Sequence, residues 1–382
     1  MKIICEKARL AESIAPAMGC VSNKNTMQPI EGLRFKALGG ICEVSAYDLE
    51  KGCKFILDCE IEEEGDCIIN AVKLNQIVRA MPEGDVVIEV SEQLIASITC
   101  GVRRFELHAL AGSDFPLMPT LDGEKGFTVS QGRLRRMIIG TDFAVAVNDS
   151  RAMLNGAFFE ATEGRLKVIS CDGNRLACRE FNGSVSTSVN SDVSNDFGFI
   201  VPGRTLDELV KMLGDGDEET TIVATRRHAM FVIGRLIFIT RLIESDYIEY
   251  DRYIPKSFKG ETRVMRDELI SSLESASLVT EEKISGHVRS PVRLDFSGGL
   301  IKVSTVSVAG RVYDEVQALN SGDSVEIAFN CRLLLEALRR ADSDEIIIKR
   351  NSAISSIVIL PADTDAEDKD ENYLLLVLPT RS

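Results

Sequence analysis

One pattern occurs three times along this chain of 382 residues, and it limits the folds that the chain can adopt. In each occurrence a short amphipathic helix is followed by an acidic turn and then by a β-branched strand. Leu74, Leu206 and Leu334 hold the same place in the three helices and are 132 and 128 residues apart. A third of the chain is about 127 residues, so three copies of one domain is the economical interpretation.

A second helical pattern precedes each of these helices, which gives two helices to each third of the chain. The six helical windows are 6–19, 70–81, 129–141, 204–213, 265–276 and 331–342. Between them, segments such as 53–63, 94–100 and 293–307 alternate polar and apolar residues, which is typical of antiparallel sheet with one wet face. We therefore predict an α+β fold. Pro16 should kink the first helix or delay its start.

Composition favours a soluble protein with several domains. The hydrophobic fraction of 45% is ordinary for globular chains, and 382 residues exceed what one core usually serves. Neither a long apolar run nor a secretory signal is evident, so we expect a cytoplasmic location. Ten cysteines without CxxC spacing fit reduced, mostly buried thiols better than a disulfide framework.

The net charge of −15 argues against a conventional nucleic-acid binder, yet the distribution of charge is uneven. The six helical windows together carry +4, which leaves −19 for the rest of the chain. A basic lining with an acidic exterior would repel DNA everywhere except at one surface. The alternative, that the helices simply expose solvated Lys and Arg, stays open on charge alone.

Several short segments resemble one protein family. They are SDFPLMP at 113–119, MLNG at 153–156, CDGNRLA at 171–177, DRYIP at 251–255 and the terminal VLPTRS. In this order they resemble the β subunit of bacterial DNA polymerase III, the replicative sliding clamp. The resemblance implies three clamp domains, at 1–122, 123–254 and 255–382, each with two helices packed on antiparallel sheets. It also implies a head-to-tail homodimer that forms a six-domain ring around duplex DNA, and an association with the nucleoid during replication.

The resemblance also implies which residues face the duplex and which form the dimer interface. A sliding ring needs sparse positive charge rather than strong phosphate contacts, which would act as brakes. The residues implied to face DNA are Lys24, Lys73, Arg79, Arg133, Arg135, Arg136, Asn148, Arg151, Arg204, Lys211, Arg332, Arg339 and Arg340. Those implied at the dimer interface are Phe105 and Leu107 on an edge strand, and Leu278 and Val279 at a helix end.

A groove for short linear peptides, between the second and third domains, is the remaining implied site. Its expected occupants are segments of the polymerase III α subunit, the clamp-loader δ subunit and other clamp-motif proteins. Asn174 stands where relatives often have His, Ile248 where Pro is common, and Leu378 and Thr380 where Met is usual, so the range of peptides should narrow. The implied wall is Leu154, Cys171, Gly173, Asn174, Arg175, Leu176, Ile248, Arg252, Tyr253, Leu376, Leu378, Pro379, Thr380 and Arg381, with Arg175, Arg252 and Arg381 as a charged rim.

No catalytic, metal or cofactor site is expected. The chain has three His and lacks the phosphate-loop, HExxH and GxSxG motifs. The acidic stretch 363–370 has Asp368 where an EF-hand needs Gly, so a solvated hairpin loop is the better interpretation. We predict a non-enzyme. A peptide-binding scaffold that never encircles DNA is the alternative, and ring closure separates the two.

Overall fold

The computed structural model describes residues 1–22, 27–121, 125–185, 197–280, 290–362 and 371–380. It divides into two compact units, which we describe separately. The N-terminal unit comprises 1–135, 186–194 and 204–242, and the C-terminal unit comprises 136–185, 195–203 and 243–382. Lys24, Arg381 and the acidic stretch 363–370 lie outside the described residues. No helix in the described part of the chain has the length and apolar character to span a membrane.

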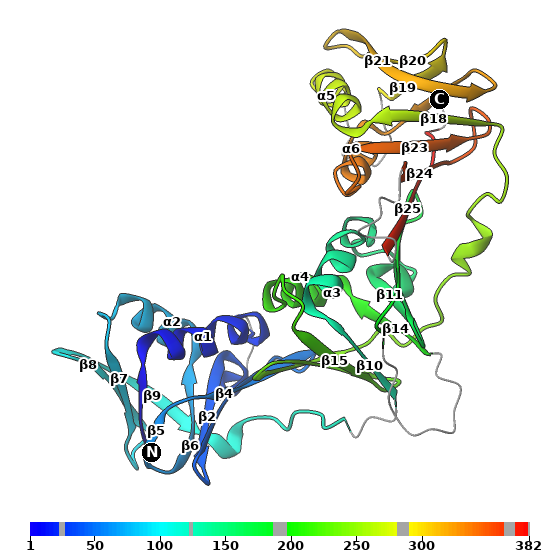
Figure 1. Ribbon diagram of the computed structural model, residues 1–382. Coiled ribbons are helices and arrows are strands. Elements are labelled where there is room, and N and C mark those ends of the chain that lie inside the picture. Colours follow the sequence, from blue (N-terminus) through cyan, green and yellow to red (C-terminus); the bar gives the residue numbers. More distant parts are fainter. Residues whose placement is uncertain (23–26, 122–124, 186–196, 281–289, 363–370, 381–382) are drawn as a thin grey trace. The chain divides into compact units, whose positions relative to one another are not determined.

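The N-terminal unit is built on one antiparallel sheet, in the order β10-β15-β16-β17-β4-β3-β2-β6-β9-β8-β7-β1-β5 (Figure 1). Its strands are β1 (Lys2–Glu6), β2 (Gly32–Leu38), β3 (Ile41–Tyr47), β4 (Lys51–Leu57), β5 (Glu60–Glu63), β6 (Gly65–Asn70), β7 (Asp85–Val90), β8 (Ile95–Cys100), β9 (Arg103–Ala111), β10 (Lys125–Ser130), β15 (Glu219–Ala224), β16 (His228–Ile233) and β17 (Leu236–Arg241).

The C-terminal unit has a second antiparallel sheet, in the order β14-β11-β12-β13-β25-β24-β23-β18-β21-β20-β19-β22. Its strands are β11 (Gly156–Thr162), β12 (Arg165–Cys171), β13 (Arg175–Asn182), β14 (Phe197–Pro202), β18 (Gly260–Met265), β19 (Val292–Ser297), β20 (Leu300–Val306), β21 (Arg311–Gly322), β22 (Val325–Phe329), β23 (Glu345–Arg350), β24 (Ile357–Pro361) and β25 (Glu371–Val377).

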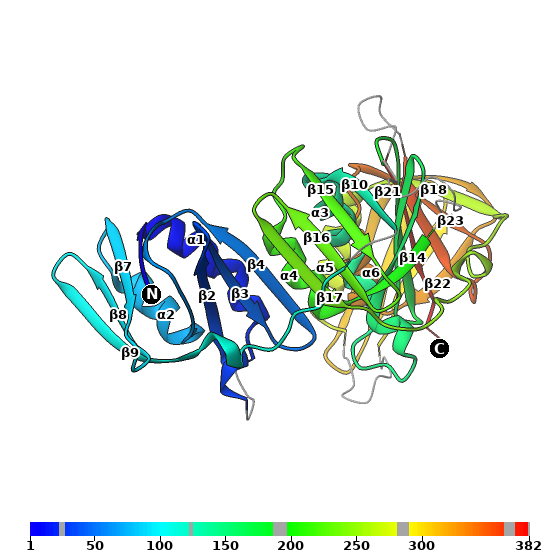
Figure 2. The same ribbon diagram turned by 90° about the horizontal axis from the view of Figure 1, so that it is seen from below.

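Six α-helices are found in the described residues, two in each predicted domain, which confirms the expected α+β pattern. They are α1 (Lys7–Ala17), α2 (Ala71–Ala80), α3 (Gln131–Ile139), α4 (Gly203–Met212), α5 (Arg266–Ser277) and α6 (Cys331–Leu338). Figures 1 and 2 show α1 and α2 side by side on the same face of their strands. The side chain of Asn70 accepts a hydrogen bond from the backbone N–H of Lys73 in α2, and that of Asn330 accepts from the backbone N–H groups of Arg332 and Leu333 in α6, so both helices begin with an Asn cap.

The expected effect of Pro16 was wrong in part. The first helix begins at Lys7 without delay and contains Pro16 as its penultimate residue. The chain continues as a 3₁₀ turn over Met18–Cys20. A proline this close to the helix end removes one backbone donor while the helix is already ending, so its cost is small.

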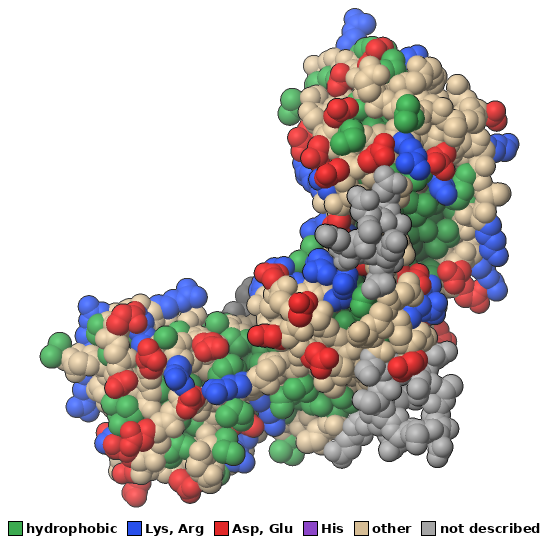
Figure 3. All heavy atoms as spheres, viewed as in Figure 1, with side chains coloured by type: hydrophobic (Ala, Val, Ile, Leu, Met, Phe, Trp, Pro, Cys, Tyr) green, Lys and Arg blue, Asp and Glu red, His purple; other side chains and the backbone are tan. Residues whose placement is uncertain are grey.

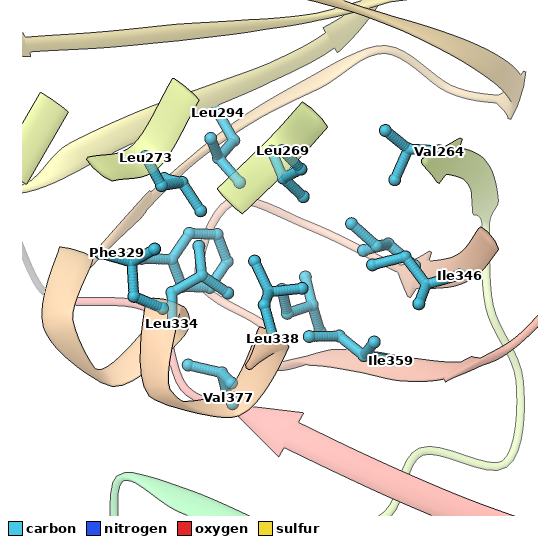
Figure 4. Close-up of a cluster of buried hydrophobic side chains, with 14 of the residues drawn as sticks. Val264, Leu269, Leu273, Leu294, Phe329, Leu334, Leu338, Ile346, Ile359 and Val377 are labelled. Carbon is cyan, nitrogen blue, oxygen red and sulfur yellow. The ribbon is translucent and has the colours of Figure 1, made fainter. Parts of the chain in front are cut away.

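The core of the third repeat shows how the helices are fixed to the sheet. Leu334 and Leu338 of α6 and Leu269 and Leu273 of α5 are fully buried. Figure 4 shows the leucines of the two helices facing one another, with strand residues Ile346 and Ile359 beside them. Each fully buried leucine stabilises the fold by roughly 2–5 kcal/mol when judged by truncation to Ala. The apolar stripe of each helix is therefore used by the core, and its polar face stays outside.

Candidate functional sites

The turn between β12 and β13 carries the CDGNRLA motif, and its geometry is set by Asp172. The Oδ1 atom of Asp172 accepts hydrogen bonds from the backbone N–H groups of Asn174 (2.8 Å) and Arg175 (3.0 Å). Gly173 has φ +89°, which side-chain-bearing residues rarely adopt. The carbonyl of Asn174 accepts from the backbone N–H of Leu378 at 2.8 Å. The motif thus holds the C-terminal segment directly.

An apolar cluster lies behind this turn and brings together four of the residues implied for the peptide groove: Cys171, Leu176, Ile248 and Leu376. Leu176 and Leu376 are partners in the β13–β25 ladder, which explains why two segments so distant in sequence meet here. Figure 3 shows hydrophobic side chains gathered on the surface beside the segment that leads into β18. Leu154 is also buried, but outside this cluster.

Sequence reasoning missed several members of the cluster. These are Phe158, Ile169, Cys178, Tyr247, Tyr250, Ile254, Phe258, Val358, Leu360 and Leu374. Val358 and Leu360 alternate on β24, so the period of the SIVILP segment was a usable signal. Tyr247 and Tyr250 lie in an irregular stretch without periodicity. Burial raises the pKa of the Tyr247 hydroxyl, which donates to the carbonyl of Ile169 at 3.3 Å.

The charged residues implied for the rim differ in exposure. Arg175 is only 8% exposed, and its guanidinium group contacts Asp172 (2.9 Å), Glu336 and the ring of Phe143. It lies beneath the rim and ties β13 to α6. Arg252 is exposed and pairs with Glu249, and Tyr253 beside it is 64% exposed.

The end of the chain is anchored beyond the last strand. Leu378 is 42% exposed, and Pro379 and Thr380 are half-buried. In addition to the Leu378 contact, the backbone N–H of Thr380 donates to the carbonyl of Ala328 at 2.8 Å. Backbone pairing therefore continues past Val377, the last residue of β25. Removing this segment would break two backbone hydrogen bonds, so side-chain substitutions are the better test of its role.

Arg151, implied to face DNA, lies close to the same turn. A Cβ atom built on Gly173 would be 3.0 Å from an Arg151 guanidinium nitrogen. Arg151 is also paired with Asp149 at 3.0 Å, and this hydrogen bond lowers the pKa of the Asp149 carboxyl to about 2. Asn148 before it is exposed, with φ +56°.

Many of the other cations implied to face DNA have acidic partners. Arg135 contacts Asp215 (2.7 Å) in the N-terminal unit, and Lys211 contacts Glu208 (3.0 Å). In the C-terminal unit the pairs are Arg136–Glu371 (3.7 Å), Arg339–Glu274 (2.7 Å) and Arg340–Asp142 (3.4 Å). Arg133 is half-buried, whereas Lys73, Arg79, Arg204 and Arg332 are exposed.

A second buried arginine joins the second and third repeats inside the C-terminal unit. Arg179 of β13 is 3% exposed and contacts Asp342, Glu371 (3.6 Å), the carbonyl of Arg340 (2.7 Å) and the ring of Tyr373 (4.9 Å). The side chain of Glu371 is almost as deeply buried, and Arg136 is its second cationic neighbour. The contact lies at the strand pair β13–β25, where the two repeats share one sheet.

Neighbouring repeats are joined by strand pairing in the same register at both internal junctions. In the N-terminal unit β17 pairs with β4, and Phe238 lies opposite Cys53. In the C-terminal unit β25 pairs with β13, and Leu375 lies opposite Ala177.

Phe238 and Leu375 hold the same place in their repeats. Phe238 of β17 lies opposite Phe231 of β16, and Leu375 of β25 lies opposite Ile359 of β24. Cys53 and Ala177 also hold the same place. Val44 lies opposite Phe55 and Val168 opposite Arg179, and Cys53 and Ala177 come two residues before those partners. Two junctions with different side chains therefore share one backbone geometry.

Two further strands are open along part of one side. Residues 103–108 of strand β9 pair with residues 95–100 of β8 on one side. On its other side, β9 pairs with β6 only from Ala109 onward. Strand β21 pairs with β20 over Arg311–Gln317, and with β18 only from Ala318. Within the described residues, the other side of 103–108 and of 311–317 has no strand partner.

These open segments correspond to the strands used at the junctions. Phe105 lies opposite Ile98, as Phe238 lies opposite Phe231, so β9 matches β17 and β25. Asp314 lies opposite Val303, as Arg179 lies opposite Val168, so β21 matches β4 and β13. Leu278 near β21 is 83% exposed, and Val279 lies beside Gly310, with a Cβ built there 3.9 Å from Val279 Cγ1.

Comparison with known proteins gives the same organisation. The DNA polymerase III β subunit N-terminal, central and C-terminal domain families match residues 1–119, 128–249 and 251–380. The chain belongs to the DNA polymerase III β subunit family. The β sliding clamp of Halalkalibacterium halodurans is 27% identical over 96% of this chain and 97% of its own. That of Bacillus subtilis is 26% identical over the full length of both.

Solved structures agree with the fold. A DNA polymerase sliding clamp from Bacillus subtilis superposes with a TM-score of 0.90 at 25% identity, covering 100% of this chain and 99% of the other. The DNA polymerase III β subunit from Pseudomonas aeruginosa gives a TM-score of 0.91 at 26% identity over both full chains. The three-domain clamp fold is thereby confirmed. The boundaries at 122/123 and 254/255 stay predictions.

Replacing Arg179 by Ala should lower the free energy of unfolding by about 3–5 kcal/mol, because it removes a buried cation from Glu371 and Asp342 and leaves Glu371 with only the partly exposed Arg136. Adding Glu371→Gln to that variant should recover part of the loss. Chemical denaturation with a probe in the C-terminal unit measures both effects, and Arg293→Ala, which breaks the exposed Arg293–Glu326 pair, is the matched control. Equal midpoints for Arg179→Ala and the control would contradict this account of the junction.

Proposed function

We propose that this protein is a sliding clamp: a non-catalytic, homodimeric ring that encircles duplex DNA without regard to sequence and tethers polymerases through a peptide-binding groove. Membership of the β subunit family supports the general activity, since the curated relatives are named β sliding clamps. The observation that carries the ring is the pair of open strand segments. Within one chain, neighbouring repeats are joined twice by strand pairing, β17 with β4 and β25 with β13. The corresponding strands β9 and β21 are each left with an open segment.

A second copy of the chain supplies the missing halves. If β9 of one copy pairs with β21 of the other in the register of the internal junctions, Phe105 lies opposite Val312 and Leu107 opposite Gly310. We call this pairing the seam. A head-to-tail joint of this kind closes when two copies of three domains complete the circle. The position of Val279 beside Gly310 supports the expectation that Leu278 and Val279 pack against Leu107 there.

The same register sets opposite charges against each other. It places Arg103 opposite Asp314 and Glu106 opposite Arg311, and opposite-charge pairs across antiparallel strands are favourable whereas like charges repel. All four side chains are exposed in the single chain. A register shifted by one residue would place Phe105 and Leu107 on the wrong face and lose both charge pairs.

The exposed cations on α2 and α4 support a contact with DNA, and the acid-paired arginines moderate it. Lys73, Arg79 and Arg204 attract phosphate, while Arg135, Arg339 and Arg340 are already neutralised by neighbouring carboxylates. Few free charges mean few counterions released, hence weak, salt-sensitive attraction without fixed register. That is the property a ring needs to slide.

The peptide groove is the third element of the proposal. The apolar cluster around Leu176 and Leu376, the exposed Tyr253 and Arg252, and the partly exposed Leu378 form a surface with an apolar interior and a polar edge. Such a surface suits a short linear peptide with two or three apolar anchors. Segments of the polymerase III α subunit and the clamp-loader δ subunit are the proposed occupants.

The seam predicts a charge-reversal result. Asp314→Arg alone should weaken the dimer, because it sets Arg against Arg103 at both seams of the ring. Combining it with Arg103→Asp should restore dimerisation. Native mass spectrometry or sedimentation over a dilution series measures the dissociation constant, with Arg293→Glu on β19 as the control for surface charge. An Asp314→Arg protein that dimerises like the parent, or a double variant no better than the single, would overturn this register.

Retention on DNA separates the clamp from the peptide-scaffold alternative. The Lys73→Glu, Arg79→Glu protein should remain a dimer but leave closed circular DNA sooner after loading, with the difference largest at low salt. Lys36→Glu, an exposed lysine on β2, is the matched control. If the parent protein is not retained on circles and is released equally from linear DNA, it is not a clamp.

The groove predicts a loss of polymerase binding without loss of the dimer. Leu378→Ala keeps the backbone bond to Asn174 but removes an apolar anchor, so binding of the purified α subunit should weaken by about tenfold or more. Calorimetry measures this, with Ile41→Ala, an exposed apolar residue of β3, as the control. Unchanged affinity in Leu378→Ala would place the partner surface elsewhere.

A further inference from the structure

Four cysteines from separate segments meet in the first repeat. They are Cys5 on β1, Cys42 on β3, Cys67 on β6 and Cys59 in the corner between β4 and β5. The ladders account for the meeting: Ile4 pairs with Glu60, next to Cys5 and Cys59, and Cys42 pairs with Leu57, two residues before Cys59. Cys59 is therefore placed between Cys5 and Cys42.

The four thiols differ in access. Cys5, Cys42 and Cys67 are buried, whereas Cys59 is half-exposed and is the one that a reagent in solution can reach. All four are free thiols. Among the described residues, no three His, Cys, Asp or Glu side chains are placed to hold a metal ion.

Cys59 is in direct contact with Cys42. The thiol of Cys42 donates a hydrogen bond to the Cys59 sulfur, which lowers the pKa of Cys59 and, together with burial, raises that of Cys42. Next to it, Asp58 holds the guanidinium groups of Arg9 and Arg235 (3.7 Å) at the same corner. A partly exposed thiol in contact with a second, buried thiol is the arrangement found at reversible oxidation sites.

We propose that Cys59 is a site of oxidation by hydroperoxides and that Cys42 resolves it to a disulfide. The Cys59 thiolate attacks the peroxide oxygen, which breaks the O–O bond, gives Cys59 sulfenic acid and releases hydroxide or alkoxide. The sulfur of Cys42 then attacks the Cys59 sulfur, forms the S–S bond and releases water. The peroxide is reduced and the two thiols are oxidised, and a dithiol reductant reverses the change.

The same repeat contains an internal control. Cys20 and Cys53 also share a thiol–thiol hydrogen bond, but both are fully buried. If contact alone decided reactivity, both pairs would oxidise equally. If access to a stabilised thiolate decides it, only the Cys42–Cys59 pair reacts in the folded protein.

The test is a titration of the full-length protein with hydrogen peroxide, followed by alkylation of free thiols and peptide mass mapping. The expected product is a Cys42–Cys59 linkage that lowers the mass by two hydrogen atoms and disappears with dithiothreitol. In Cys42→Ser, Cys59 should instead be trapped as sulfenic acid by dimedone. In Cys59→Ser, Cys42 should stay unmodified, with circular dichroism confirming that both variants fold.

Two outcomes would overturn the proposal. One is a parent protein in which Cys59 is alkylated readily but peroxide gives no linkage to Cys42. The other is oxidation of Cys20 and Cys53 at the same peroxide dose as Cys42 and Cys59, which would show that global opening rather than the local site controls the chemistry.

Discussion

The backbone pairing between the last strand of one repeat and the fourth strand of its neighbour is the constraint from which the rest follows. Strands β17 and β25 carry different side chains, yet each meets its partner in one register. Main-chain hydrogen bonds set this geometry, so side chains at the joint are free to vary. The conserved joint fixes how the helices are presented, brings Leu176 beside Leu376, and leaves β9 and β21 with open segments.

Side-chain variation makes each joint chemically distinct. The residue opposite the matching valine differs among the three repeats. It is Phe55 on β4, Arg179 on β13 and Asp314 on β21. Phe55 faces Leu236 across the first joint. Arg179 is enclosed by carboxylates and a tyrosine ring at the second. Asp314 is left exposed to solvent. At this position the internal joints are enclosed, whereas the open strand presents a solvated carboxylate, which suits the proposed contact between chains.

Much of this could be predicted from the sequence, for identifiable reasons. The helices could be predicted because their apolar stripes recur in each third of the chain, and the Asn caps at 70 and 330 mark two of their starts. The role of Arg175 was not found, although a signal exists. Asp172 and Arg175 repeat the spacing of Asp48 and Lys51, which form the same turn with a 3.0 Å ion pair in the first repeat. The first repeat has this ion pair of an aspartate and a cation but no implied peptide groove, so the pair belongs to the turn itself. Comparing the two repeats would therefore have placed Arg175 beneath the rim. The acid partners of Arg135 and Arg340 come from distant segments, and no local pattern could reveal them.

The burial of Arg179 has a mechanical consequence. A ring that must admit DNA has to open somewhere, and force applied to a closed chain of joints is released at the joint that yields most easily. Separating β25 from β13 would break the buried contacts of Arg179 with Glu371, the carbonyl of Arg340 and the ring of Tyr373. Separating the proposed seam would break only charge pairs that face solvent, and such pairs contribute little. In the proposed ring, strain would therefore be released at the two boundaries between chains, where no buried ion pair has to be broken.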